Sequence, residues 1–147
     1  MTIHTLPGGV DLPEDHPASG PHCGVTAVAV LAKISFTQAW AEICKLARYP
    51  VNWKGSTPDP ERLLILASHG VRLTAVPCKR MALGRWTARY CQRDTTYLVV
   101  TTGHIQIVRN GMATDQTGVR LVAGSQAARK LVKTVRIVRW PVRKKLT

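Results

Sequence analysis

Residues 23–33 read Cys-Gly-Val-Thr-Ala-Val-Ala-Val-Leu-Ala-Lys, with no charge before the final lysine. A segment that is apolar on every side is buried on every side, and periodicity alone does not separate a helix from a strand here. The length of the run and the small side chains of Ala27, Ala29 and Ala32 favour a helix that its neighbours approach closely. We therefore expect a central, buried helix with Cys23 in its first turn.

The segments that follow this run predict three more helices. Ser35 to Gln38 has the form of a capping box and opens a helix that ends before Pro50. A further helix has Asp59 as its N-cap, Pro60 as its first residue and Gly70 as its stop. Residues 83–91 are expected to form a short helix with Trp86 on its inner side.

The rest of the chain favours strands. Residues 71–76 alternate as a strand does, residues 95–122 are typical of a β-meander, and a last strand is expected over 134–140. Within the meander, Asn110-Gly111 is the strongest short hairpin signal. Helices first and an antiparallel sheet afterwards predict an α+β fold.

The chain of 147 residues is long enough for one domain with its own core. Residues 1–20 are rich in Pro and Gly and are interpreted as an irregular arm; residues 21–140 form the domain, and residues 141–147 a basic tail. The start of the chain lacks the pattern of a signal peptide, and no apolar run approaches the length of a membrane span. We expect a cytoplasmic protein that does not contact a membrane; its oligomeric state stays open.

Charge is the extreme feature of the composition. Twenty-one Lys and Arg face eight Asp and Glu, a net charge of +13, and no acidic residue follows Asp115. Such a terminus attracts polyanions through counterion release, which makes nucleic acid a candidate partner. The alternative is that the charge serves solubility alone. The candidate nucleic-acid-binding residues are Arg136, Arg139, Arg143, Lys144 and Lys145.

The four cysteines have no Cys-x-x-Cys spacing, so the sequence predicts neither a metal site nor a cofactor. Cys23 differs from the others by its position. A thiol at the start of a helix lies beside unpaired N–H groups, which favour the thiolate, and the same groups can receive an oxyanion. Free cysteines are nevertheless often inert core residues.

The hairpin supplies a second candidate group. If Asn110-Gly111 is its two-residue loop, Arg109 pairs with Met112, and Asp115 becomes the diagonal neighbour of His104 on one face of the sheet. An imidazole with a carboxylate behind it is the base and orienting half of a catalytic triad. The alternative is a solvent-facing polar stripe on the hairpin.

These residues resemble a known family. Gly20-Pro-His-Cys23-Gly-Val-Thr-Ala-Val-Ala, followed after a gap by Thr102-Gly-His104-Ile-Gln-Ile-Val-Arg-Asn-Gly111 and Asp115, is similar to papain-like cysteine peptidases. Within that family, the chain resembles compact bacterial and phage-encoded relatives of the bacteriocin-leader peptidases of transporters. The resemblance covers residues 18 to 120. It implies a papain-like fold and a triad of Cys23, His104 and Asp115, in the host cytoplasm or a virion if the chain is phage-encoded.

One departure from the family concerns the oxyanion hole. Papain-like enzymes carry a glutamine shortly before the cysteine, whereas the first glutamine here is Gln38. His16, Ser19 or His22 are the candidates to replace it. The expected function is a thiol-dependent hydrolase of peptide or isopeptide bonds that needs no cofactor. The alternative is a catalytically weak or inactive relative whose basic C-terminal region contacts nucleic acid.

Overall fold

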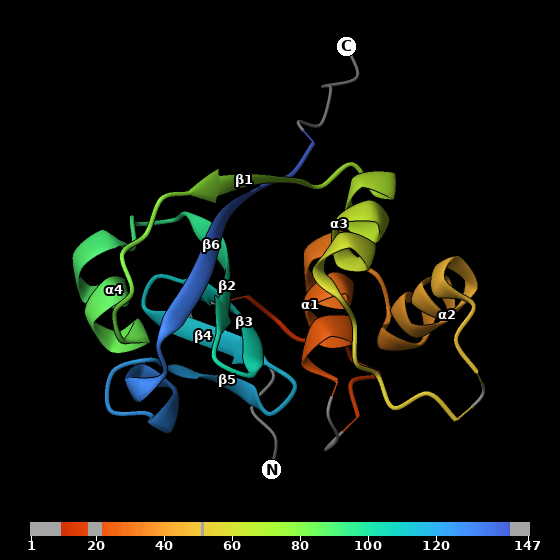
Figure 1. Cartoon of the computed structure of the whole chain (residues 1–147), viewed down its shortest axis with the longest axis horizontal. Helices are drawn as coiled ribbons and strands as arrows, with labels where there is room; N and C mark the ends of the chain where they lie inside the picture. The colour runs from red at the N-terminus through yellow and green to blue at the C-terminus, as the bar shows by residue number, and fades with distance from the viewer. Residues whose placement is uncertain (1–9, 18–21, 51, 142–147) are drawn as a thin grey trace.

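The computed structural model describes residues 10–17, 22–50 and 52–141. Figure 1 shows a twisted sheet with three helices on one side and the fourth on the other. The helices are α1 (Cys23–Ala32), α2 (Phe36–Ala47), α3 (Asp59–Ser68) and α4 (Leu83–Tyr90), with a 3₁₀ turn, η1 (Gln126–Arg129). The expected α+β class and all four expected helices are confirmed.

Six strands form one antiparallel sheet in the order β1-β6-β2-β3-β4-β5. The meander is confirmed, because β2 to β5 are consecutive in both the chain and the sheet. The final strand inserts between β1 and β2, a placement that the sequence pattern does not predict. The strands are β1 (Arg72–Val76), β2 (Thr96–Thr101), β3 (His104–Arg109), β4 (Met112–Asp115), β5 (Gly118–Leu121) and β6 (Val132–Arg139).

Each face of the sheet carries its own hydrophobic cluster. Leu98 and Ile107 pack with α1, α2 and α3, whereas Val99 and Val108 pack with α4 on the opposite face. The alternation follows from the two-residue period of strand side chains. A sheet covered on both faces explains why β2 to β4 are almost continuously buried.

Helix α1 is the centre of the larger cluster, as its composition predicts. Eight of its ten residues, Gly24 to Leu31, are buried. It contacts α2 and α3 on one side and β3 and β4 on the other. Its position therefore brings the first turn of the helix to the beginning of β3.

The helix starts differ in detail from the expected caps. Ser35 accepts a bond from Gln38 N at 3.0 Å as predicted, but the Gln38 side chain turns to Glu42, so the capping box is half formed. Asp59 is the first residue of α3 rather than its N-cap, which is Pro58. Its carboxylate is bonded instead by Arg62 and Arg136.

Residues 10–17 contain no helix or strand and lie against the domain. Leu12 is buried in the larger cluster, and Thr114 Oγ1 donates to the Val10 carbonyl at 2.7 Å. The Asp15 carboxylate accepts from Phe36 N at 2.7 Å and Thr37 N at 2.9 Å. This part of the expected arm is thus tied to β4 and to the start of α2.

Among the described residues, no single helix combines the length and the apolar composition needed to cross a membrane; α1 and α2 meet both criteria only as a pair bent by 111°.

Candidate active site

Cys23 is the first residue of α1 and is partly buried. The first intrahelical bond is donated by Thr26 to the His22 carbonyl, so the N–H groups that precede Thr26 have no partner within the helix. Burial by itself raises the pKa of the Cys23 thiol. Hydrogen bonds from His104, Ile105 N and Gly24 N, together with the charge of His104, outweigh burial and lower that pKa below its usual value. The environment therefore favours the thiolate.

The β3–β4 hairpin has the register that its turn sequence predicts. Arg109 pairs with Met112, and Asn110 and Gly111 adopt φ angles of 51° and 76°. Both angles are positive, as a type I′ turn requires, which explains the Asn-Gly pair. His104 Nε2 lies 2.8 Å from Asp115 Oδ2, so the expected contact between the two side chains is present.

Asp115 is buried, with only 5 % of its surface exposed, which contradicts a solvent-facing polar stripe. Its Oδ1 accepts from Thr117 N at 2.8 Å and Thr117 Oγ1 at 2.6 Å, and it also pairs with Arg120. Burial alone raises the pKa of this carboxyl, but the bonds from His104 and Thr117 and the Arg120 charge hold it below its usual range. The group is thus a buried carboxylate with every oxygen engaged.

The carboxylate in turn sets the state of the imidazole. The hydrogen bond to Asp115 and then that to Cys23 raise the pKa of His104 to about 9, against a smaller lowering by burial. Because Nε2 is bonded to Asp115, Nδ1 is the nitrogen left for the thiol. The arrangement thus favours a thiolate–imidazolium pair with a carboxylate behind the imidazole.

Cys23 and His104 open into a cleft of about 450 Å³. A groove of about 940 Å³ beside residues 10–15 contains neither of them. The walls of the smaller cleft come from the start of α1, the β2–β3 turn, the loop before α3, and β6. Its lining residues are Cys23, Gly24, Gly55, Ser56, Thr57, Arg62, Val100, Thr101, Gly103, His104, Ile105, Gln116 and Lys133.

The loop of residues 55–57 lies directly on the start of α1. A Cβ atom at Gly24 would approach Thr57 Oγ1 to 1.9 Å, so this close approach requires glycine. Arg62 holds the other side of the loop by donating to the carbonyl and, at 3.0 Å, to the hydroxyl of Thr57. Trp53 Nε1 donates to the Ser56 carbonyl at 3.0 Å. The wall facing Cys23 is thus fixed from three directions.

The histidines expected near the oxyanion do not line the cleft. His16 Nε2 donates to the Gln116 carbonyl at 2.5 Å, and the His16 ring packs edge-on against Phe36. His22 is the N-cap residue of α1, with its ring against Phe36 and Trp40. Ser19 lies outside the described residues. The described geometry thus gives no support to His16 and His22, and it does not test Ser19.

Three residues that line the cleft are not predicted from the sequence. Gln116 lines the cleft, and its buried Oε1 has no hydrogen-bond partner among the described residues. Arg62 and Lys133 line the cleft from α3 and β6. Gln116 is adjacent to Asp115 in the turn, so the hairpin register could have flagged it, whereas the other two depend on tertiary contacts.

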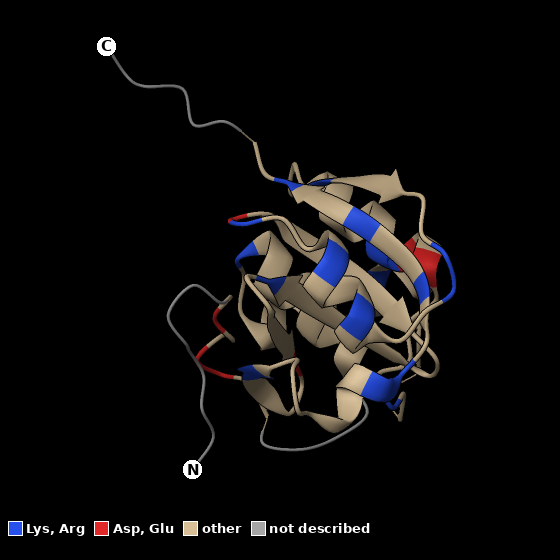
Figure 2. Ribbon diagram, turned by 90° about the vertical axis from the view of Figure 1, so that its left-hand side faces the viewer, with Lys and Arg blue, Asp and Glu red and all other residues tan. Residues whose placement is uncertain are grey.

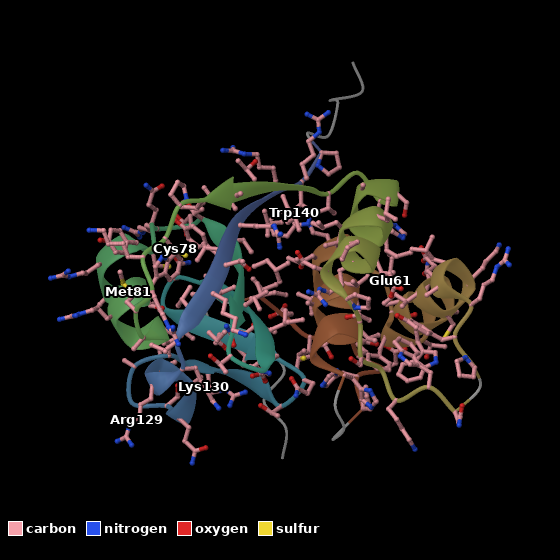
Figure 3. All side chains as sticks on the ribbon, in the orientation of Figure 1. Glu61, Cys78, Met81, Arg129, Lys130 and Trp140 are labelled. Carbon is pink, nitrogen blue, oxygen red and sulfur yellow. The ribbon has the colours of Figure 1, made fainter. Side chains whose placement is uncertain are left out.

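The remaining cysteines lie outside the cleft. Burial raises the pKa of the Cys44 thiol in α2, and the Cys78 thiol donates to the Lys133 carbonyl at 3.9 Å. Figure 3 shows Cys78 on the side of the sheet that carries α4. In the described ranges, no group of three or more His, Cys, Asp or Glu side chains is arranged to hold a metal ion.

Basic residues are spread over the elements on the side of the molecule that carries α4 (Figure 2). Of the candidate nucleic-acid-binding residues, Arg136 pairs with Asp59 at 2.7 Å and Arg139 is exposed. Arg143, Lys144 and Lys145 lie outside the described residues. Nucleic-acid contact stays a prediction.

Comparison with known proteins finds no matching family model, no similar curated protein and no similar solved structure.

Proposed function

We propose that the chain is a thiol-dependent hydrolase of peptide or isopeptide bonds, with a papain-like arrangement of its catalytic groups. The observation that carries the proposal is the alignment of three groups from separate elements. The Cys23 thiol begins a buried helix, His104 lines the same cleft and lowers the pKa of that thiol, and Asp115 Oδ2 lies 2.8 Å from His104 Nε2. A helix-borne thiol and a strand-borne imidazole with a buried carboxylate constitute the nucleophile, base and orienting group of acyl transfer.

The proposed reaction has two steps. The Cys23 thiolate attacks the carbonyl carbon, and the electron pair of the C=O bond moves to oxygen. When the intermediate collapses, the C–N bond breaks and the His104 imidazolium gives its proton to the leaving amine. Water then loses a proton to His104, attacks the thioester and releases the acid and Cys23. Asp115 stabilises the imidazolium and fixes which nitrogen faces the thiol.

The oxyanion of each intermediate requires hydrogen-bond donors close to Cys23. The unpaired N–H groups of the first turn of α1 are one source. Among the described lining residues, Gln116 carries the only side-chain carboxamide, and its Oε1 has no hydrogen-bond partner among the described residues. We assign Gln116 the role that the family resemblance gives to a glutamine before the cysteine.

Hydrolysis by the full chain tests the function. The protein is incubated with a denatured protein mixture and with a lysine-linked isopeptide, and new amino groups are counted by mass spectrometry. We expect cleavage that Cys23→Ala abolishes, and a thioester-linked fragment on Cys23 after an acid quench. Gln116→Ala is expected to lower kcat by about 10²- to 10³-fold, because one oxyanion donor is lost.

Matched variants separate these effects from damage to the fold. Cys44→Ala removes a thiol of α2 that lies outside the cleft, and Gln38→Ala removes an exposed carboxamide. Both are expected to keep full activity. Absence of cleavage of every substrate by the folded wild-type chain would refute the proposed hydrolase, and unchanged kcat in Gln116→Ala would remove that residue from the oxyanion hole.

A further inference from the structure

The cleft beside Cys23 has a positive charge excess. Among its described lining residues, Arg62 and Lys133 are cations and none is acidic. The Asp115 carboxylate behind the cleft pairs with both His104 and Arg120, so it adds no net negative charge to the site. The two lining cations therefore set the sign of the potential that a substrate meets.

Arg62 is a buried cation that is only partly neutralised. Its side chain is 6 % exposed, and it shares the Asp59 carboxylate with Arg136, at 2.8 Å and 2.7 Å. Two guanidinium groups thus face one carboxylate, which leaves one positive charge. The Nε atom of Arg62 is buried and has no partner among the described residues. Buried charge without a full complement of anions attracts a further anion.

Lys133 enters the cleft because of an irregularity in the sheet. Val100 pairs with Thr134 and Thr101 with Val132, so Lys133 is the extra residue of a bulge in β6. A bulge redirects the side chains next to it and is common beside active sites. Lys133 is exposed and forms no ion pair within the described part of the chain. Its charge is thus available to a ligand in the cleft.

We propose that this cleft selects acidic peptides, with a Glu or Asp side chain next to the bond that is cleaved. The exposed Lys133 pairs with that carboxylate. The excess positive charge of Arg62 and Arg136, which share the single carboxylate of Asp59, adds to the attraction. This inference rests on the proposed hydrolase function. It specifies acidic peptides as the substrates of that hydrolase. It also assigns the selection of these peptides to Lys133, which takes no part in bond cleavage.

Comparing the alkylation of Cys23 by a negatively charged and by a neutral reagent measures the electrostatic potential at its sulfur without a peptide substrate. In both reactions the thiolate forms an S–C bond and displaces iodide. We expect the rate ratio of iodoacetate to iodoacetamide at Cys23 to exceed that of a free model thiol at the same pH. Lys133→Met should lower this ratio about fivefold, the effect of one unit charge near the carboxylate in water, and Lys133→Glu should lower it further.

The matched control is Arg129→Glu, which makes the same change of net charge as Lys133→Glu. Figure 3 shows the Arg129 side chain extending outward from η1, and this residue does not line the cleft. In Arg129→Glu, the ratio of the iodoacetate rate to the iodoacetamide rate at Cys23 should stay near the wild-type value. An equal fall in Arg129→Glu would assign the effect to the overall charge of the protein and overturn a specific role for Lys133.

Paired peptides that differ only by Glu or Gln next to the cleaved bond extend the test to catalysis. The wild-type chain should prefer Glu about fivefold in kcat/KM, and Lys133→Met should bring the ratio of kcat/KM for the two peptides close to one. Cleavage without preference would overturn the inference and leave the hydrolase standing. An unreactive Cys23 with both alkylating reagents would instead overturn the hydrolase itself.

Discussion

Replacing His104 by alanine is expected to lower peptide hydrolysis by a factor on the order of 10⁴ to 10⁶, the range for loss of the base from a catalytic triad. The variant loses the proton acceptor and also the group that stabilises the thiolate. Loss of the His104 hydrogen bond and charge removes two of the causes that lower the pKa of the Cys23 thiol, so a smaller fraction of it is thiolate at neutral pH. Measurement of kcat/KM at neutral pH checks the expected loss.

His69→Ala is the matched control for this variant. His69 is also a partly buried histidine beside a carboxylate, with Nε2 at 2.7 Å from Glu42 Oε1, but it ends α3 and does not line the cleft. Its replacement removes a comparable contact and should leave hydrolysis unchanged. Equal losses in the two variants would mean that His104 supports the fold rather than the reaction.

Asp115→Asn is expected to lower kcat by about 10⁴-fold, since an amide in place of the orienting carboxylate permits the wrong tautomer of the histidine. The same change should lower the pKa of His104 from about 9 towards its ordinary value near 6.5. The reaction needs the protonated imidazole, which is lost as pH rises through this pKa. The alkaline limb of the pH–rate profile should therefore move to lower pH.

Asparagine is preferred to alanine at this position because Asp115 is buried against Thr117 and Arg120, and a cavity there would confuse stability with catalysis. NMR titration of the His104 ring measures the pKa directly. Asp94→Asn, at an exposed carboxylate that pairs with Arg93 and Arg109, provides the control. An unchanged His104 titration in Asp115→Asn would show that the carboxylate does not orient the imidazole.

The sequence predicts those parts of the site that depend on local structure. The uncharged run after Cys23 predicts burial on every side, and its length and small side chains favour a helix. The Asn110-Gly111 turn fixes the register of the hairpin, and the two-residue period of strands then brings Asp115 to His104. In both cases a few neighbouring residues determine the geometry.

The walls of the cleft could not be predicted in the same way. Lys133 depends on the insertion of β6 beside β2 and on a bulge at that pairing, and Arg62 depends on the packing of α3 against the loop at Thr57. These contacts join segments that are distant in the chain and carry no local signal. The sequence also does not predict that Asp115 is buried, with contacts to Thr117 in the following turn and to Arg120 on β5.

The relative alkylation rates of the four cysteines near pH 6 test the central claim most directly. The folded wild-type chain is treated briefly with iodoacetamide, and each site is quantified by peptide mapping. Because Cys23 combines a helix start with an imidazolium partner, whereas burial raises the pKa of the Cys44 thiol, Cys23 should be alkylated much faster than Cys44, Cys78 and Cys91. Alkylation of Cys23 at the same rate as the other cysteines, or more slowly, would contradict its role as a nucleophile.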